Sequence, residues 1–256
     1  MRPLALILSY DGTAYQGWQE QPERPTITGV LQSSFAEVFG HKIAVVGASR
    51  TDAGVHANEQ VARFYTDLAL DPATLMIAWN RRLPKDITLT ALDYAAAGFH
   101  PHRNVTQKIY RYTIFTQRPS PFVARFGWWY DRPLAIEKLR ESLPLLVGTH
   151  DFRSFCTGND LQDTVRTVDA ITVLQHDDKI ILEFCGQSFL RYMVRRMAGA
   201  CITIATKPYL RPIDLQRTLL AKNPEHRLIT APACGLTLQK IRYNRPIFLS
   251  ESLVSA

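Results

Sequence analysis

Along this chain, short apolar runs typical of β-strands alternate with longer segments whose apolar residues recur at helical spacing. Strands are predicted at 3–10, 42–49, 59–66, 86–95, 107–115, in both arms of a hairpin within 165–186, and at 235–243. Helices are predicted at 26–40, 71–84, 133–148, 188–206 and 212–223. Because hairpins interrupt the alternation, the pattern indicates an α+β fold with a mixed, mainly antiparallel sheet and flanking helices.

The predicted elements form two β-α-β-type halves, which indicates a pseudo-duplicated architecture. We place the halves at 1–104 and 105–256 and expect a central cleft between them, because ligands bind preferentially at such junctions. A chain of 256 residues is long enough for one large domain or two small ones.

The charge balance favours a polyanionic partner. The chain carries 30 Lys and Arg against 23 Asp and Glu, a formal net charge of +7. A basic excess of this size favours RNA or DNA as the partner over a membrane surface. The four cysteines show no CxxC spacing, so reduced thiols in a cytoplasmic protein are expected rather than disulfides or zinc ligands. The opening apolar run is too short for a signal peptide, and no segment predicts a membrane span.

A polar cluster, "SRTDAGVHA" at 49–57, lies between two apolar runs. Loops held by rigid elements often carry catalytic residues. A carboxylate such as Asp52 can act as nucleophile or base if a cation keeps it ionised in a partly desolvated site, and Arg50 is nearby. The alternative is an ordinary turn, because Asp-Ala-Gly favours one through Gly54.

Other cations gather on the predicted helix 188–206. Arg191 and Arg195 lie opposite its apolar stripe, and Arg196 follows them. This face is either simply solvated or turned toward the cleft, where arginines would suit phosphates.

Aromatic residues alternate with cations in two places. Lys108, Tyr110 and Tyr112 share one face of a strand, which is either a half-buried sheet face or a platform for a nucleic-acid base. The stretch "RFGWWYDR" at 125–132 allows core packing and nucleic-acid contact equally.

Motifs for cofactors are missing from the sequence. It contains no GxGxxG, no GxxxxGK[ST] and no nucleophile-elbow serine. His100 and His102 lack a carboxylate or cysteine partner at metal-ligand spacing. We therefore expect an enzyme that needs no cofactor and no metal.

Seven segments, in order, resemble those of the tRNA pseudouridine synthases of the TruA type. The stretch 49–57 resembles the motif that carries that family's essential aspartate, although Ser49 stands where the family usually has glycine. The others are 9–19, 79–87, 99–114, 148–156, 188–199 and 235–238. His102 stands where the family usually has arginine.

The resemblance implies isomerisation of uridine to pseudouridine at positions 38, 39 and 40 of the tRNA anticodon arm, by a homodimer without metal or other cofactor. It implies that Asp52 acts as nucleophile or base, and that Arg195 pairs with this carboxylate. It further implies that Tyr110 stacks on the target base, Arg50 holds the flipped nucleotide and Leu236 packs against the base. Further RNA contacts are expected from Arg191, Arg196 and Lys108.

Two alternatives belong to other classes of protein. A non-catalytic tRNA-binding or folding protein on the same scaffold would keep the charge and the aromatic residues while Asp52 stayed idle. A metal-dependent nuclease would need a carboxylate cluster that Asp11 and Asp52 alone do not supply.

Overall fold

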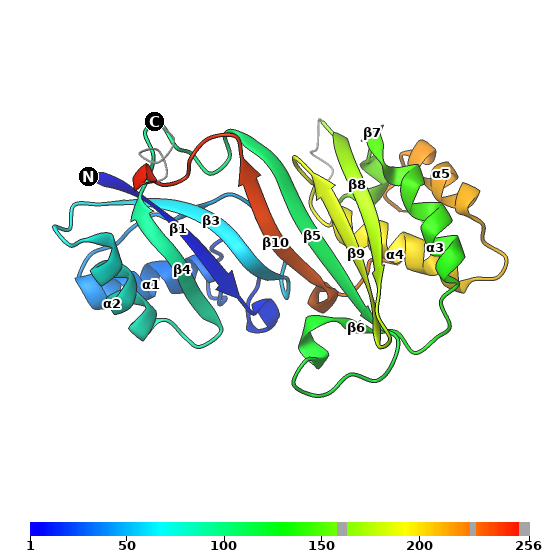
Figure 1. The fold of residues 1–256 in the computed structure, drawn as a ribbon, viewed down its shortest axis with the longest axis horizontal. Helices are drawn as coiled ribbons and strands as arrows, with labels where there is room; N and C mark the ends of the chain where they lie inside the picture. The colour runs from blue at the N-terminus through cyan, green and yellow to red at the C-terminus, as the bar shows by residue number, and fades with distance from the viewer. Residues whose placement is uncertain (158–162, 226–228, 251–256) are drawn as a thin grey trace. The chain divides into compact units, whose positions relative to one another are not determined.

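The computed structural model describes residues 1–157, 163–225 and 229–250. The chain forms two compact units (Figure 1). Unit 1 comprises Met1–Thr106 with the residues from Leu238 onward, and unit 2 comprises Gln107–Thr237. The predicted boundary at residue 104, with its central cleft, stays a prediction.

Unit 1 contains strands in the order β4-β1-β3-β10, and β1 pairs antiparallel with both β3 and β4. Its strands are β1 (Arg2–Tyr10), β3 (His56–Thr66), β4 (Ile87–Tyr94), the short β2 (Val46–Gly47) beside β3 and, from Leu238 onward, β10 (Leu236–Tyr243). Its helices are α1 (Ile27–Phe39) and α2 (Pro72–Arg82), with the 3-10 turn η1 (Gly12–Ala14).

Capping residues and apolar packing explain the two helices of unit 1. The side chains of Thr26 and Asp71 accept hydrogen bonds from the first turns of α1 and α2. Phe35 of α1, Phe64 of β3 and Trp79 of α2 then meet edge to face, with ring centroids 4.9–5.5 Å apart. This cluster holds both helices against the sheet.

Unit 2 contains a sheet in the order β5-β9-β8-β7, with β6 parallel to β5. The strands are β5 (Val105–Phe115), β6 (Trp128–Trp129), β7 (Gly148–Asp151), β8 (Val165–Gln175) and β9 (Lys179–Gly186). The helices are α3 (Ile136–Ser142), α4 (Met193–Thr206) and α5 (Pro212–Ala221), with 3-10 turns η2 (Ala124–Phe126), η3 (Leu143–Leu146), η4 (Arg153–Phe155) and η5 (Ala233–Gly235). The predicted α+β class, with a mixed, mainly antiparallel sheet and flanking helices, is confirmed.

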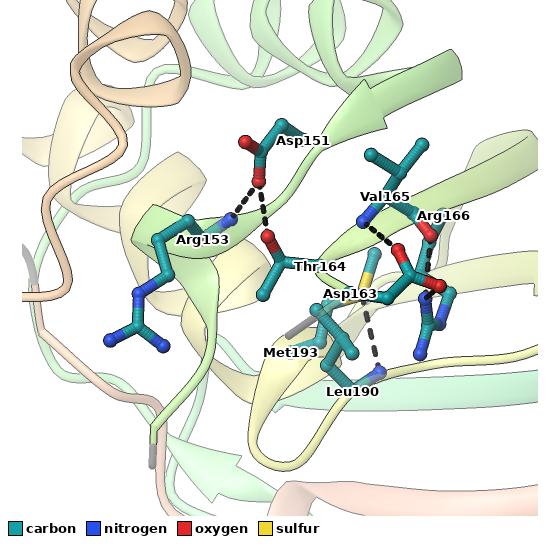
Figure 2. Close-up of polar contacts among 8 residues, drawn as sticks. All are labelled: Asp151, Arg153, Asp163, Thr164, Val165, Arg166, Leu190 and Met193. Atoms are coloured by element: carbon teal, nitrogen blue, oxygen red, sulfur yellow. Dashed lines mark hydrogen bonds and ion pairs between the residues drawn. The ribbon is translucent and has the colours of Figure 1, made fainter. Parts of the chain in front are cut away.

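Asp151 links several elements of unit 2, as Figure 2 shows in part. Its carboxylate accepts hydrogen bonds from the Thr164 hydroxyl at 2.5 Å and the Arg153 amide at 3.1 Å. Lys222, after α5, lies 3.0 Å from its other oxygen. The hydrogen bond from Thr164 leads the effects that lower the pKa of Asp151. The stretch around Asp151 therefore has a structural use, because it joins β7, β8 and α5.

Two predicted helices are shorter in the structure, each for a local reason. The helix predicted at 133–148 ends as α3 at Ser142, because Pro144 cannot donate an intrahelical hydrogen bond, and η3 follows. The helix predicted at 188–206 begins only at Met193, because Tyr192 adopts a left-handed conformation with φ of 63°. Arg191 therefore precedes α4 rather than lying on its face.

Candidate active site

Asp52 lies on a loop between β2 and β3, in unit 1. The turn predicted from Asp-Ala-Gly is present: the Val55 amide donates to the Asp52 carbonyl at 3.1 Å, and Gly54 has φ of 78°. Thr51 and Val55 are buried, whereas Asp52 is partly exposed and Arg50 is exposed. The loop is thus anchored on both sides of the partly exposed Asp52.

Two buried polar side chains hold the loop from the sheet side. Gln60 of β3 is fully buried; its amide donates to the Ser49 carbonyl at 2.6 Å and accepts from the Ser49 amide at 3.2 Å. The Tyr10 hydroxyl lies 2.9 Å from the Thr51 hydroxyl. Serine at position 49 fits this arrangement, because both of these hydrogen bonds of Gln60 are with the backbone of residue 49.

The segment that follows β1 holds the loop from its other side. The Trp18 amide donates to the Thr51 carbonyl at 3.0 Å, and the Gly54 amide donates to the Tyr15 carbonyl at 3.1 Å. The backbones lie so close that a Cβ on Gly17 would stand 2.5 Å from the Thr51 carbonyl oxygen. We conclude that the segment 9–19 supports the Asp52 loop, a function that no spacing rule in the sequence revealed.

His56, just after the loop, connects it to the end of β1. Its Nδ1 lies 3.1 Å from the Asp11 carboxylate and 3.0 Å from the Gly12 amide, and its side chain is only 3% exposed. The two contacts require opposite states of Nδ1, because the amide needs an acceptor and the carboxylate needs a donor. In either state, His56 keeps the start of β3 beside residues 11 and 12, so we assign it a positioning role.

Tyr110 lies in unit 2, on β5, opposite Phe184 of β9. The residue is 5% exposed, and its ring meets Phe189 edge to face at 5.4 Å. Its neighbour on the same face, Tyr112, is fully buried, and its hydroxyl donates to the Pro232 carbonyl at 2.9 Å. Burial raises the pKa of the Tyr112 phenol far above its ordinary value. Tyr112 is therefore a core residue and not part of a base-stacking platform.

Arg195 is tied to the chain beyond α5. Its Nε donates to the Ala231 carbonyl at 2.9 Å, and the Ala231 amide donates to the Arg195 carbonyl at 3.1 Å. The guanidinium groups of Arg191 and Arg195 lie 5.0 and 5.1 Å from the centre of the Tyr192 ring. Both guanidinium groups therefore lie within cation–π distance of the same ring, that of the left-handed Tyr192.

Arg196 and Lys108, two further predicted RNA-binding residues, are both half-buried. One terminal nitrogen of Arg196 faces three backbone carbonyls, those of Ser154, Cys156 and Pro224, at 2.9–3.3 Å. Burial lowers the pKa of Arg196 and also lowers that of Lys108, to about 8. The contacts of Arg196 link structural elements, and its phosphate contact stays a prediction.

Leu236 is 5% exposed and begins β10. The preceding residue, Gly235, packs so closely on Tyr112 that a Cβ there would lie 2.5 Å from the ring. Leu236 is therefore held by the same core that holds Tyr112.

The predicted site residues fall into two sets. Unit 1 provides Arg50 and Asp52, and unit 2 provides Lys108, Tyr110, Arg191, Arg195, Arg196 and Leu236. Each set belongs to one unit, and the pairing of Asp52 with Arg195 across the two units stays a prediction.

The described ranges contain neither a metal-ligand cluster nor a membrane-spanning helix. There, no three His, Cys, Asp or Glu side chains are grouped so that they could hold a metal ion. No helix in those ranges has the length and apolar character needed to cross a bilayer.

If the Tyr110 hydroxyl assists proton transfer, as the family resemblance implies, changing Tyr110 to Phe is expected to lower turnover by roughly 100-fold or more. The ring packing against Phe189 would survive. Single-turnover rates on tRNA would measure the effect. Tyr112→Phe is the matched control; it should cost about 1 kcal/mol of stability through its lost hydrogen bond and keep normal turnover. Full activity of Tyr110→Phe would refute a chemical role for its hydroxyl.

The Asp52 loop is anchored from both sides within an α+β scaffold, and comparison with known proteins gives the class of protein. The sequence model of a family described as tRNA pseudouridine synthase matches residues 6–102 and 143–244. The chain belongs to this family, whose members are isomerases that convert uridine in RNA to pseudouridine.

Individual relatives are similar in sequence to this chain over nearly its whole length. The tRNA pseudouridine synthase A of Pseudothermotoga lettingae is 36% identical over 95% of this chain and 100% of its own. That of Thermotoga maritima is 34% identical with the same coverage. That of an Exiguobacterium species is 37% identical over 96% of this chain and 99% of its own.

Proposed function

We propose that this chain isomerises uridine to pseudouridine at positions 38, 39 and 40 in the anticodon stem-loop of tRNA, as a cytoplasmic homodimer without a cofactor. The observation that supports the proposal best is the Asp52 loop, whose backbone is fixed by Tyr15, Trp18 and Gln60 while Asp52 itself is partly exposed. Family membership provides the reaction class.

The target uridine must leave the base stack before a side chain can reach it. Arg50 is exposed and lies two residues from Asp52, so it is suited to hold the flipped nucleotide. Asp52 then acts at the sugar or the uracil while the bond between N1 and C1′ breaks. The uracil rotates, C5 bonds to C1′, the C5 proton is lost and N1 gains a proton, so no atom is gained or lost overall.

The residues of unit 2 complete the proposed mechanism. Tyr110, fixed by Phe189, stacks on the base and assists removal of the C5 proton. Arg195, whose Nε is bound to Ala231, uses its terminal nitrogens to pair with the Asp52 carboxylate and keep it ionised. Leu236 packs against the base, and Lys108 and Arg191 contact the RNA.

The first test is release of tritium from tRNA that carries 5-tritiated uridine. The isomerisation leaves the mass unchanged but must expel the C5 hydrogen. Release by the wild-type protein supports the proposal. Binding of a cognate tRNA without any release would leave a non-catalytic tRNA-binding protein.

The affinity for tRNA is expected to fall steeply with salt, because several arginines and lysines would neutralise phosphates. Each neutralised phosphate contributes roughly 0.7–0.9 to the slope of log K against log salt concentration, so a slope of about −3 or steeper is expected. Titrations between low and moderate salt would measure it. A flat plot would show that the basic residues do not bind the RNA backbone.

A further inference from the structure

A segment of unit 2 that the proposed reaction does not use exposes several large apolar side chains. It spans residues 118–129 and is called here the aromatic segment. Phe122 is 90% exposed, Trp129 47% and Phe126 40%. Phenylalanine is among the residues most often buried, so a phenyl group exposed to this degree needs an explanation. The exposures also argue against the core-packing interpretation for Phe126 and Trp129.

The turn that presents Phe122 is well defined. The amides of Val123 and Ala124 both donate to the Ser120 carbonyl at 3.0 Å, and the Phe122 amide donates to the Ser120 hydroxyl at 3.4 Å. Pro119 and Pro121 restrict the backbone on both sides of Ser120. A ring presented on such a turn loses little conformational entropy when it binds a partner.

The far end of the segment is anchored to the sheet. β6 pairs with the end of β5 (Figure 1), with Trp129 opposite Phe115. The Tyr130 amide donates to the Phe115 carbonyl at 2.9 Å, and the Tyr130 hydroxyl lies 2.8 Å from the Thr206 hydroxyl. Trp128 meets the Tyr130 ring edge to face at 4.7 Å. Trp128 and Tyr130 thus serve as anchors, while Trp129 points outward.

Cations accompany the exposed rings. The guanidinium of Arg118 lies 5.8 Å from the centre of the Trp129 ring. Arg125 lies within η2, and Arg132 follows the segment and is exposed. Asp131 is the single acidic residue between 116 and 135. The surface therefore combines flat apolar rings with positive charge.

We propose that the aromatic segment binds unpaired nucleotides of the tRNA substrate. Bases would stack on Phe122 and Trp129, while Arg118 and Arg125 neutralise the adjacent phosphates. RNA suits this segment because phosphates can pair with Arg118, Arg125 and Arg132, and Asp131 is the single acidic residue nearby. The segment lies between the two ranges matched by the family model, so the match assigns it no function. That the RNA is tRNA rests on the proposed function.

The test is the dissociation constant of the whole protein for tRNA, measured in Phe122→Ala, Phe122→Leu and Phe122→Trp. Stacking predicts about 10-fold weaker binding for Ala and Leu and nearly wild-type binding for Trp. The rate at saturating tRNA should not change, because Phe122 is outside the proposed chemistry. Tyr209→Ala, at a residue 72% exposed elsewhere in unit 2, is the matched control and should bind normally.

Three outcomes would overturn the proposal. Wild-type affinity of Phe122→Ala would show that the ring makes no RNA contact. Wild-type affinity of Phe122→Leu would show that apolar character, and not stacking, matters. Dissociation of an oligomer in Phe122→Ala, seen by sedimentation, would assign the segment to a contact between copies. Because these readouts are binding and mass, they are independent of tritium release, which tests the proposed function separately.

Discussion

Asp52→Asn is expected to reduce turnover by roughly 10⁴-fold or more while tRNA binding changes little. Loss of an essential nucleophile or base removes the reaction step itself. The substitution is nearly isosteric, and the described contacts that hold the loop involve the backbones of Thr51 and Gly54, the Thr51 hydroxyl and the side chain of Gln60. The loop should therefore keep its conformation.

Tritium release and tRNA binding, measured in parallel on the same preparation, would test this expectation. Asp67→Asn is the matched control, because Asp67 is exposed just after β3 and outside the loop. That variant should release tritium at the wild-type rate. Normal turnover by Asp52→Asn would refute the proposed mechanism. Loss of both tRNA binding and turnover would instead assign Asp52 a role in binding the substrate.

Gly17→Ala is expected to lower kcat/KM by about 100-fold although position 17 carries no reactive group. Gly17 has φ of 93°, and an added Cβ would stand 2.5 Å from the Thr51 carbonyl oxygen. The backbone beside Asp52 would have to shift, and a displacement of about 1 Å can cost on the order of 100-fold in rate. Thermal unfolding should also show a loss of about 2 kcal/mol or more.

A second glycine separates the clash with the Thr51 carbonyl from the strain of a positive φ. Gly98, also in unit 1, has φ of 72°, and no heavy atom of the described residues lies within 4 Å of the position that an added Cβ would take. Gly98→Ala should show only the strain of a left-handed alanine, about 1–2 kcal/mol, with normal kcat/KM. If both variants lost activity equally, support of the loop by the segment 9–19 would be refuted.

Local signals predicted most of the fold. Asp71 followed by a proline marked the start of α2, and Gly40 marked the end of α1, because capping acts within one turn. Helix α4 was predicted too long because its apolar stripe continues upstream through Leu190. In the structure α4 begins only after Tyr192, because this residue is left-handed; its ring lies beside the guanidinium groups of two arginines.

Resemblance and spacing together indicated Asp52, and the turn at Gly54 was visible in the residues themselves. The supporting contacts were not visible, because each joins residues distant in the sequence. Trp18 binds Thr51 across 33 positions, and Tyr112 binds Pro232 across 120. For the same reason, the alternation of β5 could not show that Tyr112 binds the distant Pro232 as a core residue.

By itself, the sequence determined the order of strands and helices, the positive charge and the loop that carries Asp52. These features depend on neighbouring residues, whose spacing the sequence contains directly. Only the tertiary structure decided which polar and aromatic side chains are buried: Tyr112 is fully buried, Arg196 is half-buried against three carbonyls, and Phe122 is exposed. Burial depends on which distant segments pack together, and that is a property of the folded chain.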